Sequence, residues 1–246
     1  MQVFYTPEIK KITYQLTEEE SKHAIKVLRL KVGDEICMID GKGGMYFGII
    51  DEPDSKKCVI RVIEKIEQYN RRNYYLHIAI APTKNIERFE WFLEKATEIG
   101  IDEITPLLCQ RSERKVIKTE RLEKIILSAM KQSKRAYKPL FNKLTSFSNF
   151  ISNKIDGSVF IAHCEDVSKP SLKSQVAQSQ KITIFIGPEG DFSIDEIEQA
   201  KSKGYQEVHL GKSRLRTETA GIVACHTVNL LLDEQPAANT NTETVK

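Results

Sequence analysis

The 246-residue sequence contains no run of 18 apolar residues, and its start, MQVFYTPEIKK, lacks the basic segment and apolar stretch of a secretory signal. Its five cysteines are scattered, odd in number and never spaced as CxxC. This usage favours reduced thiols and argues against a zinc site. We therefore expect a soluble, cytoplasmic protein with no membrane segment and no metal.

Several common catalytic and nucleotide-binding motifs are also missing. Neither GxGxxG nor GxxxxGK[ST] occurs, so the usual dinucleotide and P-loop signatures are absent. HExxH and GxSxG are absent too. Apolar residues make up 40% of the chain and charged residues 29%, which is ordinary for a globular protein of one large or two modest domains.

Positive charge is concentrated in one segment. The formal net charge is only +3, yet residues 111–143 hold 11 Lys and Arg against 3 Glu, a local net charge of +8. Most charge runs are simply solvated faces. A block this lopsided in an otherwise slightly acidic chain favours a polyanionic partner, because lysine and arginine release counterions from phosphates.

The first 70 residues are predicted to form a small β-barrel. Residues 17–30 form a short predicted helix with Thr17 as its N-cap and Glu20 at the capping-box position. From residue 32 onward, β-rich runs alternate with turns. The polar segment EQYNRRN (67–73) breaks this pattern, so the first domain is placed at 1–70.

From residue 74 the pattern changes to alternating strands and helices. Residues 74–81, 157–164 and 181–187 are near-continuous apolar runs, typical of parallel strands buried on both faces. Amphipathic or apolar helices are predicted between and after them, at 85–100, 120–135, 193–203 and 217–232. The second domain, 74–235, is therefore α/β with a parallel sheet, and the polar tail at 236–246 is predicted to be disordered.

Three of the predicted strands lead into loops rich in small and polar residues: IAHCED, IGPEGD and LGKSRLRTETAG. Ligands of open α/β sheets bind at the carboxyl ends of the strands. A single loop of this kind is usually just a turn, but three at one sheet edge predict a binding cleft. Charged and hydroxyl side chains near it are Glu189, Arg214, Arg216, Glu218 and Thr219.

Four segments in chain order carry a resemblance that covers nearly the whole sequence: EKATEIGIDEITPL with QRSERK, AMKQSKRAYKP, IGPEGDFSIDEIE and LGKSRLRTETAG. Together they resemble the SPOUT class of RNA methyltransferases and, within it, the RsmE family, which methylates N3 of a uridine in 16S ribosomal RNA. HAIKVLRLKVGDEI resembles that family's PUA-like RNA-binding barrel. The resemblance implies a deep trefoil knot, S-adenosylmethionine as cofactor, a homodimer, and 16S ribosomal RNA or the small ribosomal subunit as partner.

The resemblance also implies site residues. The cofactor-binding positions it indicates are His163, Gly187, Pro188, Glu189, Gly190, Leu210, Gly211, Leu215, Arg216, Thr219 and Ala220. The resemblance and the basic segment together indicate the RNA-binding positions, which are His23, Arg29, Arg111, Arg114, Lys131, Lys134 and Arg135. Two residues depart from the family pattern. Asp191 replaces a common glycine but tolerates a left-handed conformation, and Lys131 replaces a common glutamate.

Arg216, Arg29 and Glu189 are the predicted catalytic residues. Removal of the uridine N3 proton leaves an anion that a nearby arginine would stabilise. For both arginines, a phosphate contact or a plain salt bridge is the simpler role. No general base is evident from the sequence. Glu189 or Glu218 could serve, although fixing its own loop is the more common role of a residue such as Glu189. Trp91 is predicted to belong to the core beside Phe89 and Phe92, with base stacking as the alternative.

Two other functions stay open. A non-catalytic RNA-binding ribosome-assembly factor would keep the basic segment without needing the cofactor cleft. A methyltransferase of the same class acting on another RNA nucleotide would keep both. Retention of the glycines at 187, 190 and 211 together with RTETAG favours an enzyme.

Overall fold

The computed structural model describes residues 2–9, 12–176, 180–233 and 242–244. It divides into two compact units, which are treated separately below. The N-terminal unit comprises Met1–Arg71, Met130–Lys138 and Ala237–Lys246, and the C-terminal unit comprises Arg72–Ala129 and Pro139–Pro236. Among the described residues, no helix combines the length and apolar character needed to cross a membrane.

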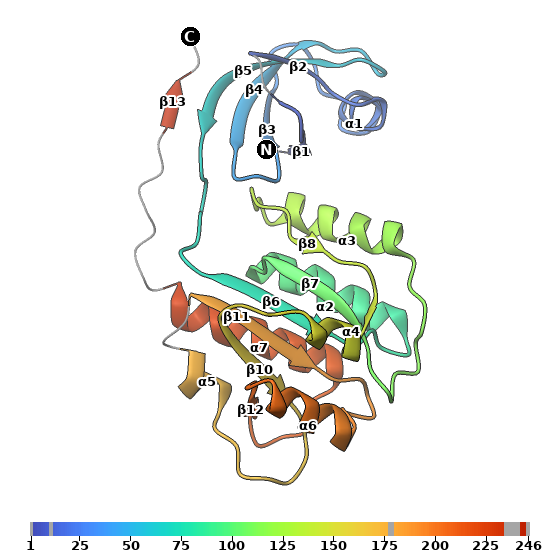
Figure 1. The fold of residues 1–246 in the computed structure, drawn as a ribbon. Helices are drawn as coiled ribbons and strands as arrows, with labels where there is room; N and C mark the ends of the chain where they lie inside the picture. Colours follow the sequence, from blue (N-terminus) through green and yellow to red (C-terminus); the bar gives the residue numbers. More distant parts are fainter. Residues whose placement is uncertain (1, 10–11, 177–179, 234–241, 245–246) are drawn as a thin grey trace. The chain divides into compact units, whose positions relative to one another are not determined.

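The N-terminal unit is built on a six-stranded sheet in the order β1-β3-β4-β5-β13, with β2 also paired to β5 (Figure 1). β1 and β3 are parallel and the other pairs are antiparallel. Its elements are β1 (Val3–Tyr5), β2 (Thr13–Gln15), α1 (Glu18–Lys22), the π-helix η1 (His23–Val27), β3 (Glu35–Ile39), β4 (Met45–Glu52), β5 (Val59–Ile66) and β13 (Thr242–Thr244).

The predicted cap of the first helix is present. The Thr17 hydroxyl accepts a hydrogen bond from the backbone N–H of Glu20 at 3.3 Å, and α1 follows. Apolar side chains from the strands and from residue 16 bury one face of the sheet and form its core, which includes Phe4, Leu16, Ile36, Met38, Ile50 and Ile60. A strand-rich N-terminal domain was expected from the sequence, and the structure has one.

Residues 130–138 belong to the N-terminal unit, although the sequence places them in the second domain. The backbone N–H of Gly43 donates to the carbonyl of Ala136 at 3.0 Å, and that of Lys138 donates to the carbonyl of Gly41 at 2.9 Å. A Cβ atom at Gly43, whose φ is +106°, would lie 2.4 Å from the Tyr137 ring. Only glycine fits this contact.

The polar tail, predicted to be disordered, is described only at Thr242–Thr244. These residues form β13, antiparallel to β5, with Thr242 opposite Ile66. For them the prediction of disorder is wrong, because backbone pairing with an edge strand needs no apolar side chain. The rest of the predicted tail lies outside the described residues.

The C-terminal unit contains a seven-stranded parallel sheet in the order β12-β10-β11-β6-β7-β8, with β9 also paired to β7 (Figure 1). Its strands are β6 (Tyr75–Ile80), β7 (Glu103–Leu108), β8 (Leu140–Phe141), β9 (Thr145–Ser146), β10 (Ser158–Ala162), β11 (Lys181–Ile186) and β12 (Gln206–Val208). Its helices are α2 (Ile86–Ile99), α3 (Thr119–Gln132, which continues into the other unit), α4 (Phe147–Ser152), α5 (Leu172–Gln175), α6 (Ile194–Ser202) and α7 (Thr217–Leu232).

Helices cover both faces of this sheet, as the continuous apolar strands predict. Ile78 and Ile80 of β6 face a core that includes Phe92 of α2 and Val228 of α7. The residues between and beyond them, Ala79 and Ala81, face a second core formed with α4 and α6. The α/β class and the parallel sheet predicted from the sequence are confirmed.

The helix boundaries predicted from capping residues are close to those observed. Asn85 caps α2, and Gly100 follows it with φ +124°. Ser193 and Glu196 form a complete capping box at the start of α6. The prediction for Trp91 is wrong: it is 44% exposed, whereas Phe89 and Phe92 are fully buried, because Trp91 lies outside the apolar stripe of the helix.

Candidate active site

The carboxyl ends of four strands meet at one edge of the parallel sheet. Ile80 of β6 is in register with Ile186 of β11, and Ile186 with Ala162 of β10. Ala162 is in register in turn with Val208 of β12. The loops that follow these residues are therefore brought together, as the sequence predicts.

The first of these loops, residues 187–192, is held in place by other parts of the unit. The Thr217 hydroxyl of α7 donates to the Gly187 carbonyl at 3.0 Å. The backbone N–H of Lys84 donates to Glu189 Oε1 at 2.8 Å. Glu189 was predicted as a catalytic residue, with fixing its own loop as the simpler alternative. The contact with Lys84 is of this second kind.

Asp191 takes the left-handed conformation predicted for it, with φ +63°. Its carboxylate Oδ2 accepts from the backbone N–H of Cys164 at 2.7 Å, and Oδ1 accepts from that of Phe192 at 2.8 Å. The aspartate therefore does more than replace a glycine, because it ties this loop to the one that follows β10.

Two arginines of the predicted RNA-binding set brace the same region. Arg111 Nη1 donates to the carbonyls of Gly190 at 2.9 Å and Phe192 at 3.1 Å. Arg114 Nε donates to the carbonyl of Thr83 at 2.9 Å. Both guanidinium groups make structural contacts here, and their role in binding phosphate remains a prediction.

A cavity of about 330 Å³ opens between the loops that follow β10 and β12 and the start of α7. Its lining combines apolar side chains, both signs of charge and exposed backbone. The lining residues are Ala162, His163, Cys164, Glu165, Asp166, Lys169, Val208, His209, Leu210, Gly211, Lys212, Ser213, Arg214, Leu215 and Ala220.

One wall of this cavity is fixed by a chain of three side chains. His163 Nε2 lies 3.0 Å from Glu207 Oε1, and Lys169 Nζ lies 3.2 Å from His163 Nδ1. Lys169 Nζ also donates to the His163 carbonyl at 3.1 Å. Burial and the Lys169 charge lower the pKa of His163, opposed by Glu207 and Asp191. The neutral imidazole accepts from Lys169 through Nδ1 and donates to Glu207 through Nε2.

The predicted cofactor residues divide into two groups. His163, Leu210, Gly211, Leu215 and Ala220 line the cavity. Gly187, Pro188, Glu189, Gly190, Arg216 and Thr219 lie at the same sheet edge but do not line it.

The sequence did not single out Cys164, Glu165 or Lys169 as cavity residues. The segment IAHCED marked the right loop, and Arg214 was noted near the cleft. No pattern in the sequence locates Lys169, whose contact with His163 depends on how the loop folds back.

A second hollow, also of about 330 Å³, lies between the first turns of α2 and α7. Trp91 and Glu218 face it from the two helices. The complete lining is Asn85, Glu87, Arg88, Trp91, Glu218 and Thr219. Thr219, predicted to contact the cofactor, lies here.

The other predicted RNA-binding residues all belong to the N-terminal unit: His23, Arg29, Lys131, Lys134 and Arg135. Lys131 Nζ lies 2.9 Å from Glu20 Oε1, and His23 Nδ1 lies 3.8 Å from the other oxygen of that carboxylate. Arg29 and Lys134 are exposed, with φ of +58° and +54°. The lysine that replaces the family glutamate at 131 therefore forms an ion pair of its own.

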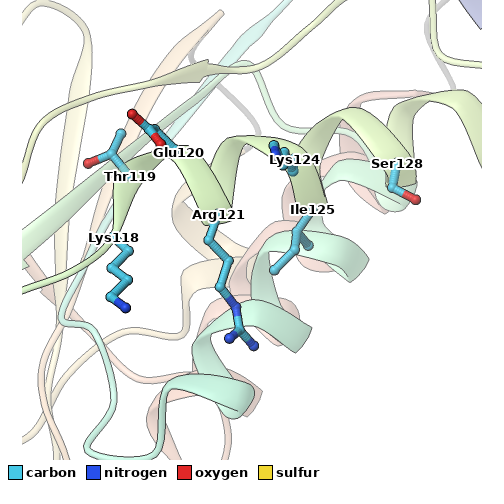
Figure 2. A pocket seen from close by; sticks show the side chains of 7 residues that line it. All are labelled: Lys118, Thr119, Glu120, Arg121, Lys124, Ile125 and Ser128. Atoms are coloured by element: carbon cyan, nitrogen blue, oxygen red, sulfur yellow. The ribbon is translucent and has the colours of Figure 1, made fainter. Parts of the chain in front are cut away.

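Part of the basic segment surrounds a wide, shallow hollow of about 770 Å³ on α3. Figure 2 shows Lys118, Arg121 and Lys124 around it, with Arg121 and Ile125 extending from the same side of the helix. Arg121 Nε lies 2.7 Å from Glu90 Oε1 on α2. With exposed cations and no buried polar group, this surface suits a phosphate backbone better than a small ligand.

Comparison with known families identifies the chain. The RNA methyltransferase domain family matches residues 70–229, and the RNA methyltransferase PUA domain family matches residues 16–63. The chain belongs to this RNA methyltransferase family. The resemblance inferred from the sequence motifs is confirmed, and so is the PUA character of the N-terminal domain.

Its relatives in this family include ribosomal RNA small subunit methyltransferase E of Synechocystis, which is 31% identical over 92% of this chain and 76% of the relative. A crystal structure of a "probable rRNA-methyltransferase" from Porphyromonas gingivalis is 39% identical, with TM-score 0.86 over 95% of this chain and 99% of that one. Ribosomal RNA small subunit methyltransferase E of Neisseria gonorrhoeae, solved bound to S-adenosylmethionine, is 25% identical, with TM-score 0.85 over 94% and 98%.

Proposed function

We propose that this protein transfers a methyl group from S-adenosylmethionine to N3 of one uridine in the 16S ribosomal RNA of the small subunit. The observation that carries the proposal is the 330 Å³ cavity at the carboxyl edge of the sheet, in a chain whose relatives are ribosomal RNA methyltransferases.

The residues of the cavity suit this cofactor. Leu210, Leu215 and Ala220 offer apolar walls for the adenine, and the backbone around Gly211 offers groups for its polar edge. Lys169 and Arg214 suit the carboxylate of the methionine part, and Glu165 and Asp166 suit its ammonium group. When bound, S-adenosylmethionine supplies a methyl group on a positively charged sulfur.

Arg216 is the residue to which we assign stabilisation of the uridine anion. It lies at the N-cap of α7, directly after the cavity residue Leu215, and its side chain is exposed. A cation at this place favours the base after loss of its N3 proton. Arg29, in the N-terminal unit, we assign to holding the RNA.

A homodimer, a trefoil knot in the C-terminal domain and a cytoplasmic location complete the proposal. They follow from the family resemblance and, for the location, from a substrate that belongs to the ribosome. The N-terminal domain and the cationic surface of α3 are assigned to the RNA backbone.

The test is to incubate the purified protein with radiolabelled S-adenosylmethionine and small ribosomal subunits that lack the modification, and then to map the methylated nucleoside. The proposal predicts 3-methyluridine at one site. A different methylated nucleoside would contradict the assigned base. Failure to bind the cofactor at all would favour an RNA-binding assembly factor.

A further inference from the structure

Glu218 is a buried carboxylate with one oxygen unpaired among the described residues. It lies in the first turn of α7 and is 7% exposed. Oε2 is fully covered and has no hydrogen-bond partner in the part of the chain that the structure describes. Oε1 lies 4.0 Å from Arg88 Nε. Buried polar groups in native proteins are nearly always paired, so this carboxylate is expected to find its partner in a ligand.

The hollow that Glu218 lines also has a flat aromatic wall. Trp91 lies on α2, is 44% exposed, and is the only tryptophan of the chain. An exposed tryptophan at the edge of a hollow is suited to stacking on a nucleobase.

The polar groups of the hollow form a recognisable set. The Arg88 guanidinium, the Asn85 amide and the Thr219 hydroxyl can donate hydrogen bonds, and the carboxylates of Glu218 and Glu87 only accept them. The imide edge of uracil presents the complementary set, which is a carbonyl acceptor, the N3–H donor and a second carbonyl acceptor. Cytosine and adenine present an unprotonated ring nitrogen at the central position, which a carboxylate disfavours.

The hollow and the cofactor cavity share the start of α7. Leu215 and Ala220 line the cavity, whereas Glu218 and Thr219, within the same turn, line the hollow. Asn85 follows Lys84, whose backbone is bonded to Glu189 of the first loop. A base in the hollow is thus next to the site that we assign to the cofactor.

We propose that this hollow receives the acceptor uracil, with its face on Trp91, and that Glu218 accepts the N3 proton. The proposal rests on the proposed function and names the base that the function requires. The N3–H bond breaks, its electron pair stays on N3, and the proton forms a bond to a carboxylate oxygen of Glu218. Rotation about the terminal bond of the side chain, a soft torsion, presents either oxygen.

The first experiment measures binding without the cofactor, through the fluorescence of the single tryptophan. A short RNA with uridine at the target position is compared with the same RNA carrying 3-methyluridine, which lacks the proton. We expect quenching and at least tenfold tighter binding of the uridine RNA. Glu218→Met, which removes the acceptor, brings the two affinities within threefold. Glu94→Met, an exposed carboxylate further along α2, preserves the preference.

The second experiment separates the proton acceptor from a mere contact. Glu218→Gln keeps an acceptor oxygen but cannot take a proton, so single-turnover methylation is expected to fall at least 100-fold with unchanged affinity for S-adenosylmethionine. Melting curves of Glu218→Gln and Glu218→Met establish that both variants fold.

Three results would overturn the proposal. One is equal binding of the uridine and 3-methyluridine RNAs by the wild type. Another is an undiminished methylation rate in Glu218→Gln. The third is a fall in mass, in sedimentation of Glu218→Met, to that of a monomer, which would assign the hollow to contact with a second copy of the chain. A wild type that makes no 3-methyluridine would instead contradict the proposed function itself.

Discussion

Two loops lie at the same carboxyl edge of the parallel sheet, one after β11 and one after β12, and they differ in how their polar groups are used. In the first, residues 187–192, backbone and side-chain groups are bonded to Thr217, Lys84, Arg111 and Cys164. In the second, residues 209–216, the backbone of His209 is paired with Pro170 and Leu172, and the N–H of Gly211 donates to the His209 ring. There the side chains of Lys212, Ser213, Arg214 and Arg216, all described, make no hydrogen bond or ion pair.

This difference indicates that the two loops have different roles. A loop whose groups are already paired is a fixed wall, and its residues contribute chiefly to stability. A loop with unpaired, exposed side chains has groups available for a ligand, and ordering them is part of binding. Substitutions in the first loop should therefore lower stability, and substitutions in the second should lower activity or ligand binding.

The largest expected effect is on activity, in the second loop. Arg216→Ala is predicted to lower kcat/KM roughly 100-fold, about 2.7 kcal/mol of transition-state stabilisation, because the alanine cannot stabilise the uridine anion. Its melting temperature should stay close to that of the wild type, and Arg216→Lys should recover part of the rate. Methylation at more than half the wild-type rate would contradict the assignment.

A smaller effect, on stability, is expected in the first loop. Arg111→Ala removes the donor to the carbonyls of Gly190 and Phe192, so the free energy of unfolding should fall by about 1–2 kcal/mol in urea denaturation. Arg61→Ala is the matched control, since its pair with Asp51 is exposed on both sides and is worth at most about 1 kcal/mol. Equal stabilities for the two variants would show that Arg111 does not brace the loop.

An effect of similar size is expected at Asp191. Asp191→Ala loses both carboxylate contacts and places alanine at φ +63°, at an expected cost of about 1–2 kcal/mol. Asp191→Gly loses the same contacts but accepts the conformation freely, so it should cost less. If the glycine variant were the less stable of the two, backbone strain would not be the cause.

The sequence predicted the features that depend on local chemistry. Caps at Thr17 and Ser193 and the apolar strands at 74–81 and 181–187 appear where they were expected. The motifs also placed three loops at one edge of the sheet, because parallel strands bring their carboxyl ends together.

The structural features that could not be predicted from the sequence depend on contacts between distant segments. Residues 130–138 pack in the N-terminal unit through backbone bonds to Gly41 and Gly43, and backbone bonds leave no pattern in side chains. The same holds for Lys169 against His163. Trp91 was assigned to the core from its apolar neighbours, yet helix geometry points it away from the buried face that holds Phe89 and Phe92.

The measurement that tests the account most directly is backbone hydrogen exchange with and without S-adenosylmethionine. The account predicts strong protection on cofactor binding in residues 163–166 and 209–215, which line the cavity. It predicts little change in residues 187–192, whose carbonyl and carboxylate groups are already paired. Protection confined to residues 187–192 would place the cofactor on the first loop and contradict the different roles of the two loops.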